Sequence, residues 1–189
     1  MVQKFYLLLL SSCLWEKFSH VIFDMDGLIL GKNFSIRVFE KVTKIYLNFS
    51  IFVLGVKKLI HHLKEHNVPI ALASGSLHKD YLLKTAQHDE LFQLFPIKVF
   101  GDDPDLKRGK PFPDQFILTS SKFADSPMPD NVLVFEDSPN GVLAAKAAGM
   151  GVVMVPDRRL DEKLYNNSTQ VIFSLEDFKP ELFGFPCYD

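Results

Sequence analysis

Apolar and polar positions alternate in two distinct rhythms along this chain. Short apolar runs rich in β-branched side chains favour strands, and they occur at 20–24, 69–74, 97–100, 131–136, 151–155 and 170–173. Between them, apolar residues recur every three or four positions, as in amphipathic helices, at 55–67, 77–93, 112–123 and 139–148. Strands that alternate with helices predict an α/β fold with a mostly parallel sheet and helices on both faces.

The helix at 139–148 has clear start and stop signals. Ser138 can accept a hydrogen bond from the first turn, and Pro139 suits the first helical position. Gly149 follows the last helical residue and favours a left-handed turn that ends the helix. The strand at 131–136 is therefore expected to pass directly into a helix with a defined N-terminus.

The first 18 residues break the alternation. Lys4 precedes an apolar run from Phe5 to Leu10, as at the start of a secretory signal, but bulky residues stand where a cleavage site would follow. The run is also too short to span a bilayer. We expect residues 1–18 to be an apolar leader outside the core and residues 19–189 to form the folded unit. We expect a cytoplasmic protein, with secretion as the less favoured alternative.

Composition narrows the classes of function. A chain of 189 residues is the size of one domain. Apolar residues make up 47% and charged residues 23%, as in ordinary globular proteins, and a net charge of -2 offers no footprint for a nucleic acid polymer. The two cysteines, Cys13 and Cys187, form neither a disulfide framework nor a metal-binding motif. We expect a monomer without a membrane or nucleic acid partner.

Two carboxylates stand where the first predicted strand ends. Asp24 and Asp26 follow the apolar run Val21-Ile22-Phe23, and Gly27 allows the chain to turn away. Residues two apart in a strand face the same side, so the two charges would share a small space, which is costly without a cation or a shared proton. The alternative is a solvated pair of aspartates at a strand end.

Further polar residues follow the other predicted strands. In a parallel sheet, ligands bind outside the carboxyl ends of the strands. Ser74 and Gly75 follow the second strand, Asp137 follows the fourth, and Lys110 lies in the loop after the third. The sequence therefore predicts that acids, a hydroxyl group and a lysine converge on one edge of the sheet.

This set suits phosphoryl transfer. Asp24 can attack phosphorus, and Asp26 can protonate the leaving oxygen and later deprotonate water. Ser74, the N–H groups after it, and Lys110 can hold phosphate oxygens, although Ser74 could instead only cap a helix. Mg²⁺ prefers oxygen ligands, and we expect Asp24, the backbone carbonyl of Met25, and Asp137 to bind it.

Four segments resemble, in order, the motifs of the haloacid dehalogenase superfamily. They are Phe23-Asp24-Met25-Asp26-Gly27, Ala73-Ser74-Gly75-Ser76, Gly109-Lys110-Pro111-Phe112-Pro113-Asp114 and Phe135-Glu136-Asp137-Ser138-Pro139-Asn140-Gly141-Val142. The resemblance covers residues 19–189, and the segment 144–150 is typical of the phosphatase and phosphoglucomutase branch. It implies a Rossmann-like three-layer core and a Mg²⁺-dependent phosphomonoesterase with an aspartyl-phosphate intermediate.

The resemblance also implies finer roles. Glu136 is a candidate metal ligand, through water, or else it orients Lys110, and the backbone carbonyl of Asp26 is a further candidate ligand. Within the branch the chain is similar to the pseudouridine-5′-phosphatases, on the segments 101–104, 153–157 and 177–184. The implied substrate is a small phosphorylated metabolite, a nucleoside monophosphate.

The chain departs from this branch between its first two motifs. Family members carry a helical cap there that closes over the substrate, whereas residues 31–54 leave room for about one helix, at 35–47. A largely missing cap puts the choice of substrate in doubt and allows a weakly active or inactive homologue as the alternative. A phosphomutase is less favoured, because it depends on a full cap to exclude water.

Overall fold

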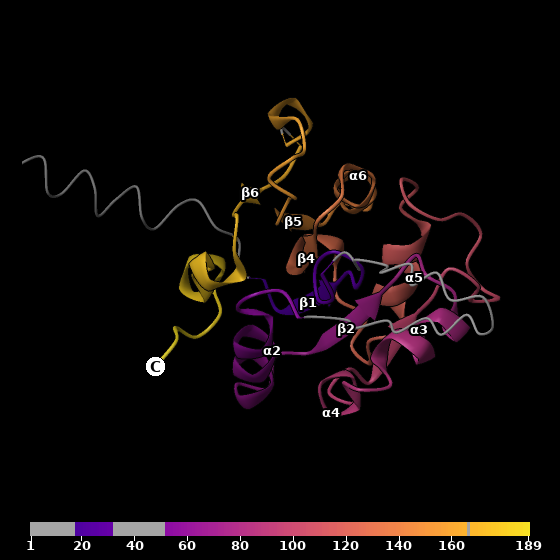
Figure 1. The fold of residues 1–189 in the computed structure, drawn as a ribbon, viewed down its shortest axis with the longest axis horizontal. Coiled ribbons are helices and arrows are strands. Elements are labelled where there is room, and N and C mark those ends of the chain that lie inside the picture. Colours follow the sequence, from indigo (N-terminus) through magenta and orange to yellow (C-terminus); the bar gives the residue numbers. More distant parts are fainter. Residues whose placement is uncertain (1–17, 32–51, 166) are drawn as a thin grey trace, which may run out of the picture.

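A six-stranded parallel sheet forms the centre of the molecule (Figure 1). The computed structural model describes residues 18–31, 52–165 and 167–189. The strand order is β3-β2-β1-β4-β5-β6. The strands are β1 His20–Phe23, β2 Ile70–Ala73, β3 Ile97–Val99, β4 Val132–Glu136, β5 Gly151–Met154 and β6 Gln170–Val171. All six predicted strands are confirmed.

Helices connect the strands. They are α2 Val56–Glu65, α3 His78–Thr85, α4 Asp89–Phe92, α5 Asp114–Ser121 and α6 Pro139–Ala147, with 3₁₀ turns η1 Pro129–Asn131, η2 Glu162–Leu164, η3 Leu175–Asp177 and η4 Pro180–Phe183. The prediction of one helix over 77–93 is wrong, because the chain bends between α3 and α4. The bend lets Tyr81 and Phe92 reach the same core, where their rings meet edge-on with centroids 5.6 Å apart.

The strand pleat divides the core into two layers. Val21 and Phe23 of β1 face a cluster that includes α2, α3, α4 and the C-terminal turns. Ile22 faces the opposite cluster, which includes Phe116 of α5 and Val142 of α6. Because successive strand residues point to opposite faces, one apolar strand serves both layers. The predicted three-layer α/β architecture is confirmed.

The start and stop signals of α6 are also confirmed. The Ser138 side chain accepts a hydrogen bond from the Gly141 N–H, and Pro139 is the first helical residue. Gly149 adopts φ +78°, the left-handed conformation that ends a helix. β4 therefore runs into α6 through only Asp137 and Ser138, which fixes where these two side chains lie.

The folded core begins one residue earlier than predicted. Phe18, assigned above to the leader, is buried, and its ring lies 5.9 Å from that of Phe183. The Phe18 N–H donates to the Phe183 carbonyl. The leader prediction is wrong at this residue because the apolar ring fills a gap beside Gly151. The rest of the predicted leader lies outside the described residues.

Most of the predicted cap segment, 31–54, also lies outside the described residues. Its two ends are described, and Leu30 forms an antiparallel bridge with Phe52. The Val53 N–H donates to the Ile29 carbonyl. The chain thus leaves the core and returns to it at neighbouring points.

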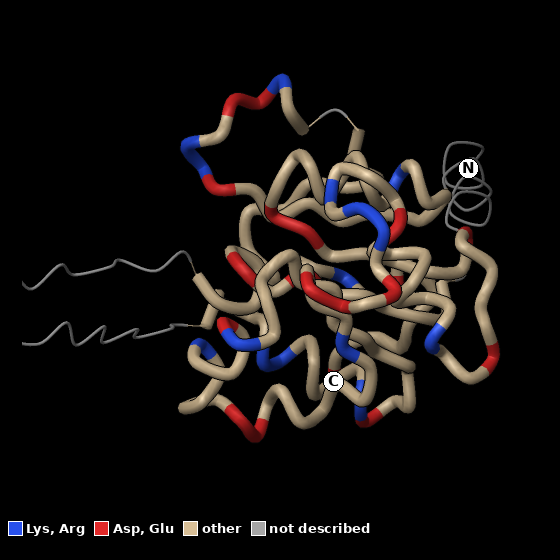
Figure 2. Tube along the Cα trace, turned by 90° about the vertical axis from the view of Figure 1, so that its right-hand side faces the viewer, with Lys and Arg blue, Asp and Glu red and all other residues tan. Residues whose placement is uncertain are grey.

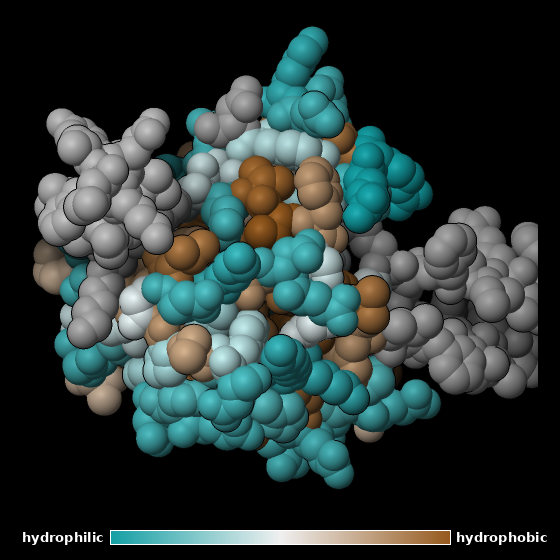
Figure 3. All heavy atoms as spheres, turned by 90° about the vertical axis from the view of Figure 1, so that its left-hand side faces the viewer, coloured by the Kyte–Doolittle hydropathy of each residue, from teal (hydrophilic) through white to brown (hydrophobic). Residues whose placement is uncertain are grey.

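The surface mixes polar and apolar residues. Basic and acidic residues are interspersed along the trace (Figure 2). On the face that carries α2 and the C-terminal turns, apolar patches lie among polar side chains (Figure 3). Within the described residues, no helix has the length and apolar character needed to cross a membrane.

Candidate active site

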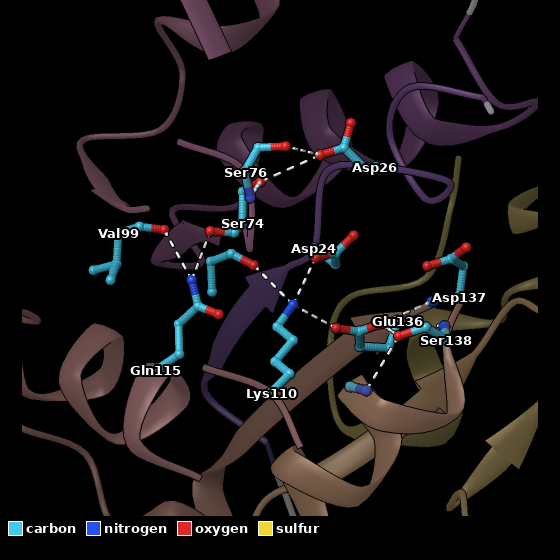
Figure 4. Close-up of polar contacts among 12 residues, drawn as sticks. Asp24, Asp26, Ser74, Ser76, Val99, Lys110, Gln115, Glu136, Asp137 and Ser138 are labelled. Carbon is cyan, nitrogen blue, oxygen red and sulfur yellow. Dashed lines mark hydrogen bonds and ion pairs between the residues drawn. The ribbon is translucent and has the colours of Figure 1, made fainter. Parts of the chain in front are cut away.

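The predicted site residues gather at the carboxyl end of the sheet (Figure 4). Asp24 follows β1, and its N–H donates to the Phe135 carbonyl of the neighbouring β4, which fixes its backbone beside the end of that strand. Oxygens of Asp24, Glu136 and Asp137 all lie within 4.8 Å of one another, and all three residues are buried. The carboxylates that the sequence placed at two separate strand ends therefore form one cluster.

Lys110 brings a positive charge to this cluster. Its Nζ donates to Asp24 Oδ1 at 2.6 Å, to Glu136 Oε1 at 2.5 Å and to the Ala73 carbonyl at 3.0 Å. These three acceptors use all the protons of the ammonium group. Burial lowers the pKa of Lys110, but the two carboxylates outweigh burial and raise this pKa above its ordinary value. Lys110 therefore stays charged.

Glu136 is held as firmly as Lys110. Its Oε2 accepts from the N–H groups of Asp137 and Ser138 at 3.1 and 3.2 Å and from Ser138 Oγ at 3.1 Å. A side chain at Gly141 would place Cβ 1.9 Å from the Glu136 carboxyl group, so a glycine is needed there. With both oxygens engaged, Glu136 fits the orientation of Lys110 better than direct metal binding.

Burial and neighbouring carboxylates act against ionisation of Asp24. Burial raises the pKa of Asp24 well above its ordinary value; Lys110 opposes this, and Glu136 and Asp137 add to it. A cation near Asp24 would favour its ionised form and so oppose this shift. The oxygen donors of Asp24 and Asp137 are of the type that Mg²⁺ prefers, so the residues present fit a divalent metal.

Gly27 makes room for the predicted metal ligand Asp137. An ideal Cβ on Gly27 would lie 2.1 Å from Asp137 Oδ2. Gly27 also adopts φ +98°, which side-chain-bearing residues rarely do. The glycine therefore serves both the turn after the aspartate pair and the close approach of a carboxylate from β4.

The Met25 carbonyl does not suit its predicted role as a metal ligand. It accepts hydrogen bonds from the N–H groups of Ile29 and Leu30, each at 3.0 Å. These bonds close the turn after β1. The sequence predicted a turn at Gly27 but not that the Met25 carbonyl would be engaged in it. The Asp26 carbonyl takes no part in them, so it is the better backbone candidate of the two.

Asp26 lies in a separate network on the more exposed side of the site. Its Oδ1 accepts from Lys84 Nζ at 2.6 Å, and its Oδ2 accepts from Ser76 Oγ at 2.6 Å and, at a long 3.5 Å, from Ser74 Oγ. Lys84 Nζ also donates to Ser76 Oγ at 2.9 Å. The two aspartates thus have different lysine partners, Lys110 for Asp24 and Lys84 for Asp26.

Ser74 and Gly75 form the turn after β2. Ser74 is fully buried, and its Oγ accepts from the Ser76 N–H at 3.2 Å. Ser74 does not cap α3, because α3 begins at His78 with Leu77 before it. An ideal Cβ on Gly75 would meet nothing within 4 Å, so space is open beside this turn. Both residues lie where a phosphate oxygen could meet them.

Sequence reasoning missed three members of the site. Lys84 and the Ser76 hydroxyl group hold Asp26. Gln115 is buried, and its Nε2 donates to the Ser74 carbonyl at 2.7 Å. Ser76 belongs to the motif after the second predicted strand, but only its N–H group was considered there. Lys84 and Gln115 lie inside helices, away from the predicted strand ends, so the sequence did not mark them.

Comparisons with known proteins bear on this arrangement. Residues 48–149 match the model of the haloacid dehalogenase-like hydrolase family. A Drosophila melanogaster protein named "Probable pseudouridine-5′-phosphatase" is 38% identical over 92% of this chain and 96% of its own. An Arabidopsis thaliana protein named (DL)-glycerol-3-phosphatase 2 is 52% identical over 71% of this chain and 57% of its own. The Drosophila alignment has 223 positions, more than the 189 residues of this chain, so part of that relative has no counterpart here.

Solved structures agree on the fold. CbbY from Rhodobacter sphaeroides, in complex with phosphate, superposes with a TM-score of 0.68 at 16% identity and covers 85% of this chain and 96% of its own. A hydrolase from Deinococcus radiodurans, with bound phosphate and sodium, has a TM-score of 0.68 at 18% identity, and the match covers 90% of this chain and 99% of the hydrolase. The sheet and its helices therefore match folds that hold phosphate in those proteins.

Proposed function

Because the chain belongs to the haloacid dehalogenase-like hydrolase family and is a phosphoric monoester hydrolase, we propose that Asp24 is its nucleophile and Asp26 its general acid and base. The observation that carries this proposal is the fixed, buried position of Asp24, held by Lys110, which is held in turn by Glu136. A nucleophile that is positioned and desolvated before substrate arrives loses little free energy to reorganisation.

In the proposed reaction, Lys110 binds Oδ1 of Asp24, and Oδ2 attacks phosphorus. The Oδ2–P bond forms, the bond from phosphorus to the leaving oxygen breaks, and Asp26 gives its proton to that oxygen. Water then attacks phosphorus, its proton passes to Asp26, and the bond from Asp24 to phosphorus breaks. Ser74 and the N–H group of Gly75 donate to the phosphate oxygens, and Lys110, whose protons are already engaged, contributes positive charge to phosphate binding.

Mg²⁺ is the proposed cofactor. Asp24, Asp137 and the Asp26 carbonyl would hold it, with Glu136 acting on Lys110 rather than on the metal. When bound, the ion supplies positive charge that favours the ionised form of Asp24 and neutralises the phosphate oxygens. The donor set supports this proposal, since oxygens of three buried carboxylates lie within 4.8 Å of one another and are of the type that Mg²⁺ prefers.

The proposed substrate is pseudouridine 5′-monophosphate. It is supported by the likeness to the Drosophila protein, whose alignment covers nearly all of both chains. A second candidate is glycerol 3-phosphate, supported by the higher identity to the Arabidopsis protein over a shorter part of each chain. We propose a cytoplasmic monomer with a cap reduced to residues 31–54, in which loss of the cap lowers selectivity and turnover.

Phosphate release tests the proposal. Purified protein with Mg²⁺ is given pseudouridine 5′-monophosphate, glycerol 3-phosphate and a simple sugar phosphate, and Asp24→Asn serves as the matched variant. We expect release by the unaltered protein and a loss of at least about 10³-fold in the variant. Equal release by both proteins would show that Asp24 is not the nucleophile. Transfer of phosphate to a sugar, without release, would indicate a phosphomutase instead.

A further inference from the structure

We propose that Lys84 is a positioning residue that, together with Ser76, holds the carboxyl group of Asp26 ready to meet the leaving oxygen. The inference rests on the proposed function and goes beyond it, because it assigns a role to a residue outside the four motifs. It is built on the closed triangle of contacts among Lys84, Asp26 and Ser76.

The triangle fixes both oxygens of Asp26. Lys84 Nζ binds Oδ1 and Ser76 Oγ binds Oδ2, each at 2.6 Å, and the two donors are joined to one another at 2.9 Å. A carboxylate held at one oxygen can rotate about its axis, whereas one held at both cannot. Charge assistance and short distances make these bonds stronger than neutral ones.

Asp26 needs such support more than Asp24 does. The side chain of Asp26 is 41% exposed, and that of Asp24 is 9% exposed. Asp24 is confined by the packed core around it, but Asp26 lies past the end of β1, where the core does not enclose its side chain. The Lys84 side chain is 22% exposed, so its ion pair is partly shielded from water.

Lys84 is itself well anchored. It lies in the last turn of α3, beside the buried residues Tyr81 and Thr85, which face the core. The Tyr81 ring contacts those of Phe92 and Phe100, with centroids 5.6 and 4.8 Å away. The helix therefore presents the ammonium group from a rigid base, which a positioning residue requires.

The geometry gives Lys84 a specific task. A general acid must lie within hydrogen-bond reach of the leaving oxygen, and misplacement costs rate. When Asp26 gives up its proton, the ammonium group of Lys84 also faces the carboxylate that forms. Loss of Lys84 is expected to impair the step in which the leaving oxygen is protonated and to leave attack by Asp24 unaffected.

Two substrates separate this role from a structural one. Glycerol 3-phosphate has an alkoxide leaving group that must be protonated, whereas p-nitrophenyl phosphate leaves as a stable anion. Because both substrates share the later hydrolysis of the phospho-enzyme, the readout is the rate at which the leaving group is released in the first turnover. We expect Lys84→Gln to lower this rate by about 10-fold or more with glycerol 3-phosphate and by less than about 3-fold with p-nitrophenyl phosphate. Lys84→Arg, which keeps the charge, should recover part of the loss.

Matched controls complete the design. Asp26→Asn should show the same substrate dependence with a larger loss, and Lys79→Gln, an exposed lysine of the same helix, should change neither rate. Thermal unfolding of each variant reports folding separately. A loss in Lys84→Gln that is equal for both substrates, or absent, overturns the inference while the proposed function stands. An unaltered protein that releases no phosphate from either substrate overturns both.

Discussion

The two aspartates of the site lie two residues apart yet occupy opposite kinds of surroundings. Asp24 is enclosed by the core, and it shares Lys110 with a second buried carboxylate, Glu136. Asp26 is half exposed and has Lys84, from a helix at the side of the site, as its partner. Lys110 neutralises charge on the buried side, where water cannot do so. Lys84 mainly orients Asp26 on the exposed side.

The largest effect that tests this difference is expected from Lys110→Met. Removing the ammonium group leaves Asp24 and Glu136 buried without their cation, which costs about 3–5 kcal/mol of unfolding free energy. Burial already raises the pKa of Asp24, and Lys110 opposes that rise. In the variant, folded Asp24 keeps its proton to higher pH than the unfolded chain does. The unfolding free energy of the variant should therefore fall further below that of the unaltered protein as the pH rises. Chemical denaturation of both proteins at acidic and at neutral pH measures this difference.

The next largest effect is expected from adding Mg²⁺, which should stabilise the buried side of the site. Mg²⁺ at about 100 times its dissociation constant should raise the unfolding free energy by about 2.7 kcal/mol. Asp137→Asn should remove most of this gain, and Asp130→Asn, at an exposed position, should keep it. Because metal and proton compete for Asp24, whose pKa is raised, affinity should increase with pH. Calorimetry in buffers of different ionisation enthalpy measures the released proton, and a gain retained in Asp137→Asn would contradict the proposed ligand.

A smaller effect is expected from Gly27→Ala. The added methyl group would clash with the Asp137 carboxylate, and the backbone at this position has a φ of +98°, which alanine rarely adopts. We therefore expect the unfolding free energy to fall by about 1–3 kcal/mol and metal binding to weaken. Gly109→Ala is the matched control, because nothing lies within 4 Å of its ideal Cβ. Equal thermal stability of the two variants would show that the turn and Asp137 can move apart without cost.

The smallest change in stability is expected from Lys84→Met. A partly exposed ion pair contributes about 0.2–1 kcal/mol to stability, so the variant should unfold close to the unaltered protein while its catalysis changes as described above. The losses of unfolding free energy in Lys84→Met and Lys110→Met can then be compared directly. Similar losses in the two lysine variants would mean that the two sides of the site do not differ in the way their exposure indicates.

The residues of the buried side were predictable from the sequence, whereas on the exposed side Asp26 was predictable and the contacts that hold it were not. Asp24, Lys110 and Asp137 stand directly after apolar runs or in a motif loop, and parallel strands bring their carboxyl ends together whatever the details of packing. Their contacts also depend on glycines at fixed places in the same segments, as at Gly27.

The exposed side depends on features without a local signal. Lys84 reaches Asp26 from the last turn of α3, and no local pattern in the segment 77–93 distinguishes it from the other lysine there. The same segment bends after Thr85, whereas its periodicity predicted one helix. The surroundings of the Met25 carbonyl lack a local signal for a related reason. Its carbonyl is engaged by a turn whose hydrogen bonds depend on the positions of residues four and five places later. Helix bends and tight turns are set by tertiary contacts, which sequence periodicity does not report.

The bridge between Leu30 and Phe52 has a consequence for how this chain could be rebuilt. Because the departure and return points are neighbours held by the core, the 21 positions between them can be exchanged for a longer segment without moving a strand of the sheet. The entropic cost of closing a loop grows only slowly with its length. Leu30 and Phe52 are therefore fixed attachment points. A complete cap from a relative could be inserted between them, and the substrate selectivity of the chimaera would show whether the cap determines selectivity.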